Sequence, residues 1–327
     1  MHARGLRYDR WLLKADGAHG GRGTAVFEAG ALKAVHALRA RRAEREAAGE
    51  TGYWGAPTTQ HEARAALLPV LRKALPRRVV FAVPGAHADW PDFLSAFTRV
   101  GGVVEAVPGA VLGHPTVNIF VAPSGEVSVC SAVDSLLAAP FVYGGASFPQ
   151  TCVPHAAVAG AALAVGRVLS DQGVLGCARA RARARAGRGG CWIHAAAAAR
   201  WRLRRYASID FVAFRDDASR ASRLWAVDLD LRPSAPAASF SLFHFLLGGR
   251  YSAATGEYAA PLALLPPPPA SPGKGGAPPA GVEPPRPELA PRSFVSVEYL
   301  AHPALAPLQV CARPMRLMHI RMRAPCD

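Results

Sequence analysis

Short β-rich runs alternate with helix-forming segments through residue 247, and this alternation limits the fold more than any other feature of the sequence. A strand, a glycine turn and a second strand are expected over 8–27, with further strands at 78–83, 102–107, 116–121, 126–131, 208–214 and 224–231. Helices are expected at 31–48, from Thr58 or Thr59 as the cap to Leu75, and at 90–100, 155–169 and 237–247. This order predicts an α/β (α+β) fold with mixed sheets and flanking helices.

Two stretches of biased composition interrupt the pattern. Residues 177–207 contain four Ala-Arg repeats, a glycine-rich run and five consecutive alanines, which predicts a low-complexity insertion. Residues 261–292 hold 12 of the 29 prolines and cannot form a packed core, so a linker is predicted there.

Charge and cysteine usage exclude several classes of protein. Nine arginines between Cys177 and Arg205 carry much of the net charge, which falls from +15 to +6 without them. The six cysteines form no CxxC pair, so neither a zinc site nor a disulfide framework is indicated. The N-terminus has no apolar core of a signal peptide, and no apolar stretch is long enough to span a bilayer. A soluble intracellular protein without a membrane partner is expected.

A lysine and a glycine-rich turn form the first candidate site. Lys14 ends a predicted strand, and Gly20, Gly21, Arg22, Gly23 and Thr24 follow it. A lysine supplies a point charge for a triphosphate, and glycines let backbone N–H groups approach phosphate oxygens. The spacing is that of neither a Walker A loop nor a GxGxxG fingerprint, and it also fits an ordinary hairpin turn. Glu105, at the end of another apolar strand, could accept hydrogen bonds from a ribose or stay solvated.

Three aspartates and an arginine form the second candidate site. Asp210 interrupts an apolar strand, and Asp228, Asp230 and Arg232 alternate along the next one. Period-two spacing places the last three on one strand face. Crowded carboxylates are stabilised by a hard cation such as Mg²⁺, and the arginine could contact a phosphate. A solvent-exposed polar face of an edge strand explains the same spacing.

Taken in order, these pieces resemble the ATP-grasp superfamily, in which a strand lysine and a glycine-rich hairpin cover a triphosphate and late acidic residues hold magnesium. Within it, the chain is most similar to the C-terminal region of the IQ motif-containing protein H family, over about residues 8–258. Besides the segments above, the stretches at 101–106, 123–129, 148–151 and 245–249 carry this resemblance. Asp228-x-Asp230-x-Arg232 replaces the superfamily's Glu-x-Asn-x-Arg, and the family's calmodulin-binding motif is absent from this sequence.

The resemblance implies a domain plan and a set of roles. It implies a partial lid and nucleotide subdomain at 1–110, a metal and nucleotide subdomain at 111–260 and a tail at 293–327, with the N-terminal subdomain missing. ATP would be held by Lys14, by the glycine turn 20–24 and by Glu105. Mg²⁺ would be held by the three aspartates, and Arg232 would be the catalytic residue.

The resemblance leaves the activity open between two classes. One is a ligase-like enzyme that phosphorylates an unknown carboxylate substrate with ATP and then joins it to an amine or thiol. The alternative is a catalytically inactive module that binds protein partners in a cilium or flagellum, with the cytoplasm as the general location. A third hypothesis, from composition alone, is RNA binding through the arginines of 177–207.

Overall fold

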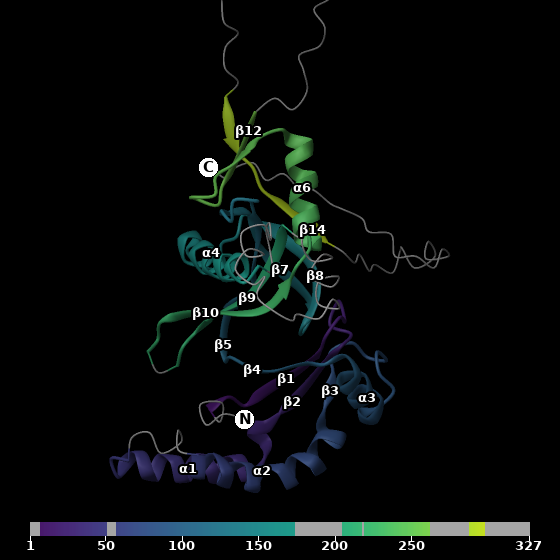
Figure 1. Ribbon diagram of the computed structural model, residues 1–327, viewed down its shortest axis with the longest axis vertical. Helices are drawn as coiled ribbons and strands as arrows, with labels where there is room; N and C mark the ends of the chain where they lie inside the picture. The colour runs from purple at the N-terminus through teal and green to yellow at the C-terminus, as the bar shows by residue number, and fades with distance from the viewer. Residues whose placement is uncertain (1–6, 51–56, 174–204, 218, 262–287, 298–327) are drawn as a thin grey trace, which may run out of the picture. The chain divides into compact units, whose positions relative to one another are not determined.

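The computed structural model describes residues 7–50, 57–173, 205–217, 219–261 and 288–297 (Figure 1). The chain divides into two compact units. Unit 1 comprises Met1–Val111, Leu137–Gly144 and Phe214–Arg223, and unit 2 comprises Leu112–Leu136, Gly145–Ala213 and Leu224–Asp327. Most of the predicted insertion at 177–207, most of the linker and most of the C-terminal tail lie outside the described residues.

Unit 1 is built on a four-stranded sheet in the order β3-β2-β1-β4. Its strands are β1 (Arg10–Ala15), β2 (Thr24–Glu28), β3 (Val80–Phe81) and β4 (Gly102–Val107). The pairs β1–β2, β1–β4 and β2–β3 are antiparallel. The predicted strand, glycine turn and strand over 8–27 is therefore confirmed, whereas the strand expected at 78–83 is only two residues long.

Helices cover one face of this sheet. They are α1 (Lys33–Ala47), which follows the short 3-10 turn η2 (Ala29–Ala31), α2 (Pro57–Arg78) and α3 (Trp90–Val100). Buried residues of α1 and α2, including Val35, Leu38 and Leu67, pack with Phe27, Trp11 and Leu13. Because alternate residues of a strand face opposite sides, Leu12 and Lys14 lie on the face away from this core.

The sequence predicted the first residue of α3 correctly but not that of α2. Helix α2 begins at Pro57, so Thr58 and Thr59 lie inside its first turn and the prediction that they cap it was wrong. Proline suits this first position because its missing N–H has no partner within the helix in any case. Helix α3 has the predicted bounds, and the Asp89 side chain accepts a hydrogen bond from the Asp92 N–H at 2.9 Å.

Unit 2 is built on a seven-stranded sheet in the order β10-β9-β6-β7-β8-β14, with β5 (Ala110–Gly113) paired to β9. The other strands are β6 (Pro115–Val121), β7 (Val127–Ala139), β8 (Val142–Phe148), β9 (Tyr206–Arg215), β10 (Ser222–Asp230) and β14 (Phe294–Val297). The pairs β6–β7, β6–β9 and β8–β14 are antiparallel. The expected strands at 116–121, 126–131, 208–214 and 224–231 are all present, and β7 extends beyond its predicted end.

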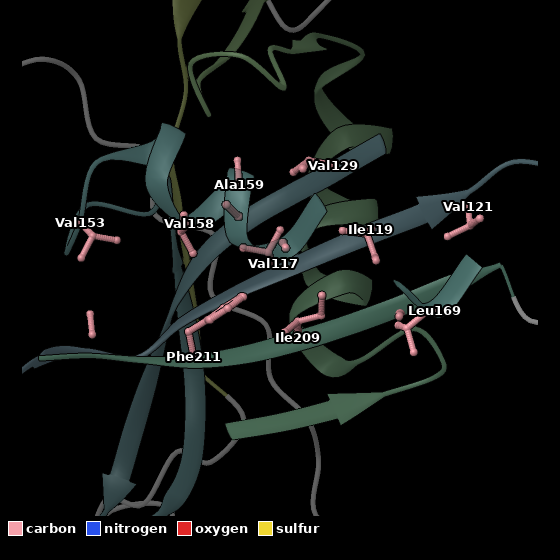
Figure 2. Packing of buried hydrophobic residues seen from close by; sticks show 14 residues of the cluster. Val117, Ile119, Val121, Val129, Val153, Val158, Ala159, Leu169, Ile209 and Phe211 are labelled. Atoms are coloured by element: carbon pink, nitrogen blue, oxygen red, sulfur yellow. The ribbon is translucent and has the colours of Figure 1, made fainter. Parts of the chain in front are cut away.

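Helix α4 (His155–Asp171) packs on one face of this sheet. Figure 2 shows Val117, Ile119 and Val121 of β6 with Ile209 and Phe211 of β9 in this core. The approach is close, because a Cβ on Gly166 of α4 would lie 2.8 Å from the Ile119 side chain.

Helix α6 (Ala235–Leu247) forms a second, aromatic core in unit 2. Phe240 and Phe243 of α6 pack against Phe148 of β8, Phe294 of β14 and Tyr258. Tyr258 begins β12 (Tyr258–Pro261), which lies between β11 (Arg250–Tyr251) and β13 (Leu289–Pro291) in a small sheet. Strand β13 falls within the range expected to be a linker. Its residues nevertheless form a strand, because their backbone pairs with β12.

The predicted combination of strands with flanking helices is confirmed by this architecture. Among the residues that the structure describes, no helix is both long and apolar enough to cross a membrane.

A matched pair of phenylalanines on α6 tests the aromatic core. Phe243 is 1% exposed, whereas Phe245, two residues along the same helix, is 81% exposed. We expect Phe243→Ala to lower the free energy of unfolding by about 3–5 kcal/mol through the cavity it leaves. We expect Phe245→Ala to change it by less than about 0.5 kcal/mol. Urea denaturation of both variants measures the difference, and similar losses for the two would contradict this packing.

Candidate functional site

Lys14 and Glu105 meet on the face of the unit 1 sheet that α1 and α2 leave uncovered. Lys14 pairs with Thr24 of β2 and Val103 of β4, and Glu105 of β4 pairs with Leu12 of β1. The Lys14 Nζ lies 2.9 Å from Glu105 Oε2, and both side chains are about one-quarter exposed (24% and 22%). Two residues that the sequence singled out separately are thus brought into one ion pair by the antiparallel pairing of β1 with β4.

The glycine-rich turn joins β1 to β2 directly beside this pair. Its backbone closes on itself, because the Ala15 N–H donates to the Gly23 carbonyl (2.9 Å) and the Thr24 N–H to the Gly21 carbonyl (3.0 Å). Gly20 and Gly21 both have positive φ, at 62° and 78°. Their surroundings differ: a Cβ on Gly20 would have no atom within 4 Å, but one on Gly21 would lie 2.7 Å from the Phe141 carbonyl oxygen.

Asp210 lies on β9, facing away from the core under α4. Its Oδ1 accepts a hydrogen bond from Thr116 Oγ1 of β6 at 2.6 Å, and Thr116 Oγ1 is 2.7 Å from Ser135 Oγ of β7. The register pairs Thr116 with Asp210 directly. The carboxylate therefore belongs to a row of polar side chains that crosses three neighbouring strands.

Asp228 and Asp230 lie at the end of the neighbouring strand β10, and Arg232 follows the strand. The Arg232 Nε donates to Asp230 Oδ1 at 3.4 Å, and Asp228 Oδ1 accepts from the Leu229 N–H at 2.8 Å. The structure thus joins Asp230 to Arg232. Within the described ranges, no three His, Cys, Asp or Glu side chains are grouped as metal ligands, so the three predicted aspartates are not gathered into such a cluster.

A second polar row in unit 2 was not anticipated from the sequence. The Asn118 side chain of β6 donates to Ser131 Oγ of β7 at 2.9 Å and accepts from the hydroxyl of Ser208 of β9. Ser234, the N-cap of α6, donates to Asn118 Oδ1 at 3.2 Å and accepts from the Ala237 N–H at 3.4 Å. The alternation of Thr116 and Asn118 with Val117 and Ile119 is the sequence pattern that could have indicated both rows.

Cys152 is a half-buried thiol close to a carboxylate. Burial, reinforced by the neighbouring Asp134 carboxylate, raises the pKa of the Cys152 thiol to about 12. Burial also raises the pKa of Cys130. Since the thiolate is the nucleophilic form, neither of these two cysteines is suited to covalent catalysis at neutral pH.

Comparisons with known proteins identify the class. Residues 3–179, more than half of the chain, match the family model described as IQCH-like, ATP-grasp. The chain therefore belongs to the ATP-grasp proteins.

Within that class it is a member of the IQCH-like family. It is 24% identical over 263 residues to IQ motif-containing protein H of Danio rerio; the match covers 80% of this chain but only 22% of that protein.

Two solved structures are also similar. One is the biotin carboxylase domain of Hydrogenobacter thermophilus 2-oxoglutarate carboxylase with MgADP, ADP and bicarbonate (12% identity, TM-score 0.37, covering 75% of this chain and 35% of that one). The other is the ADP complex of purK, N5-carboxyaminoimidazole ribonucleotide synthetase (9% identity, TM-score 0.35, covering 79% of this chain and 47% of that one).

The two glycines at positive φ give a matched test of how the turn is packed. We expect both Gly20→Ala and Gly21→Ala to destabilise the protein, because alanine is strained at this φ. Gly21→Ala should cost about 1 kcal/mol or more beyond Gly20→Ala, since its methyl group would also meet the Phe141 carbonyl. Equal losses in thermal or urea denaturation would show that Phe141 does not pack against the turn.

The raised pKa of Cys152 predicts slow alkylation of the native protein. With a pKa of about 12, roughly one Cys152 in ten thousand is a thiolate at pH 8. We expect iodoacetamide at pH 8 to modify Cys152 far more slowly in the native protein than in guanidinium, as measured by peptide mass spectrometry. Equal rates in the two conditions would contradict the raised pKa of Cys152.

Proposed function

We propose that this chain is an ATP-binding module that acts on the magnesium complex of the nucleotide. The observation that carries the proposal is the Lys14–Glu105 pair beside the glycine turn, on the sheet face that α1 and α2 leave uncovered. Lys14 would contact the phosphates as a point charge, and the backbone of Gly20–Thr24 would lie over them. When the nucleotide binds, Glu105 would leave its ion pair with Lys14 and accept hydrogen bonds from the ribose hydroxyls, because a carboxylate is an acceptor.

The residues of unit 2 fit a magnesium ion by their chemistry. Mg²⁺ prefers oxygen ligands and is commonly held by one or two carboxylates together with substrate phosphates and water. Asp210 and Asp228 offer such carboxylates on neighbouring strands, so a cluster of three protein ligands is not required. When bound, the ion would neutralise charge on the phosphates. Asp230 is proposed as a further ligand or, through its contact with Arg232, as the residue that orients the guanidinium.

The finer proposal is a carboxylate–amine or carboxylate–thiol ligase reaction. A substrate carboxylate would attack the terminal phosphorus of ATP, ADP would leave, and the amine or thiol would displace phosphate from the acyl phosphate. Arg232 would neutralise the transferred phosphoryl group, because a guanidinium pairs with its oxygens in two hydrogen bonds. No nucleophile from the protein is needed for this reaction.

A second candidate is a catalytically inactive module that binds protein partners in a cilium or flagellum. The observation in its favour is the replacement of the superfamily's glutamate and asparagine by Asp228 and Asp230, which shortens one proposed ligand. The ligase and the inactive module share the nucleotide fold, and fold alone does not establish catalysis.

The test is a thermal-shift titration with MgATP. A ligand that binds only the folded state stabilises it by about 2.7 kcal/mol at one hundred times its dissociation constant. We expect a concentration-dependent rise in the melting temperature of the wild type that is lost in Lys14→Ala and reduced in Asp228→Ala. Each variant is compared with its own melting temperature without nucleotide.

Lys73→Ala is the matched control, because Lys73 is an exposed lysine of α2 on the helical layer of unit 1. It should respond to MgATP like the wild type. If Lys14→Ala keeps the MgATP-dependent rise in melting temperature, Lys14 is not part of the nucleotide site. The absence of any shift in a cooperatively melting wild type would favour the inactive module.

A further inference from the structure

Three polar side chains from three neighbouring strands form a chain that ends at Asp210. Ser135 of β7, Thr116 of β6 and Asp210 of β9 are joined by O···O distances of 2.7 Å and 2.6 Å. Thr116 is 1% exposed and lies between them on β6. Its neighbour Val117 points to the opposite side, into the apolar core under α4.

The chemistry of the groups fixes the direction of this chain. An ionised carboxylate can only accept hydrogen bonds, so the Thr116 hydroxyl proton points to Asp210. A hydroxyl has one proton and two lone pairs, so Thr116 then accepts from Ser135. Both protons are thus directed toward the carboxylate, and each hydrogen bond polarises the next. This arrangement holds the Asp210 side chain in one orientation.

Position 116 would otherwise suit an apolar residue. Valine has nearly the shape of threonine and a high preference for strands, and residues 117, 119 and 121 of the same strand are all buried aliphatics. A buried hydroxyl must be hydrogen-bonded or it destabilises the fold. Thr116 meets this requirement with Asp210 and Ser135, the first of which is a proposed magnesium ligand.

We infer that Thr116, supported by Ser135, is a positioning residue for the metal site: it holds the Asp210 carboxylate in the orientation that receives a divalent cation bound with the nucleotide. The inference rests on the proposed function, because it takes Asp210 as a ligand. Mutation of the groups that orient metal ligands typically weakens metal affinity by about 10- to 100-fold.

The experiment measures binding of Mn²⁺, a spectroscopic substitute for Mg²⁺, by electron paramagnetic resonance at a fixed ATP concentration. Thr116→Val keeps the shape and removes the donor, and we expect about 10-fold or weaker Mn²⁺ affinity. Thr116→Ser keeps the hydroxyl and should retain nearly wild-type affinity. Ser135→Ala removes only the supporting donor and should give a smaller loss than Thr116→Val. Binding of ATP without a metal ion should be the same in all of them.

Ser296→Ala is the control for a lost buried hydroxyl in the same sheet, because Ser296 is 5% exposed and donates to the Ala146 carbonyl rather than to a carboxylate. It should leave Mn²⁺ affinity unchanged even where stability falls. If Thr116→Val fails to fold, the Mn²⁺ affinities of the wild type, Thr116→Ser and Ser135→Ala still test the inference. Unchanged Mn²⁺ affinity in Ser135→Ala overturns it.

Asp210→Ala separates the inference from the proposed function. Weaker Mn²⁺ binding in Asp210→Ala but not in Thr116→Val would overturn the positioning role alone. Unchanged Mn²⁺ binding in Asp210→Ala would overturn the proposed ligand and the inference with it. Weakening in both, with rescue by Thr116→Ser, is the expected result.

Discussion

The packing of α4 onto β6 and β9 determines which side chains of the larger sheet remain available for chemistry. Val117 and Ile119 of β6 and Ile209 of β9 are fully buried on the α4 side. Because strand residues alternate, this packing directs Thr116, Asn118 and Asp210 to the opposite side. A slip of one residue in the register would bury these polar groups in the apolar core, so the core and the polar rows specify the same register.

Unit 1 follows the same principle with different elements. Helices α1 and α2 bury Phe27, with Trp11 and Leu13 partly buried beside it, on one face of its sheet. The other face carries Lys14 and Glu105, whose charges are paired with each other across the neighbouring strands β1 and β4. In both units the candidate functional residues discussed above lie on the sheet face opposite this apolar core, and strand pairing determines which of their side chains contact one another.

The sequence predicted the elements better than the contacts between them. Period-two and helical patterns located most strands and helices, including both bounds of α3, because each pattern reflects burial within one element. Lys14 and Glu105 were recognised separately, but their contact depends on β1 pairing with a strand far along the chain. The row through Asn118 and Ser208 depends on register in the same way. Strand β13 was missed because its order comes from pairing with β12, while its own composition resembles a linker.

Ser234 links the start of a helix to the centre of a sheet through a single oxygen atom. Its hydroxyl accepts from the Ala237 N–H, donates to Asn118 Oδ1 and lies 2.6 Å from the hydroxyl oxygen of Ser208. The first turn of α6 consequently cannot fray without breaking bonds that belong to β6 and β9. Arg232 lies two residues before Ser234, so these bonds anchor one end of the segment that carries it.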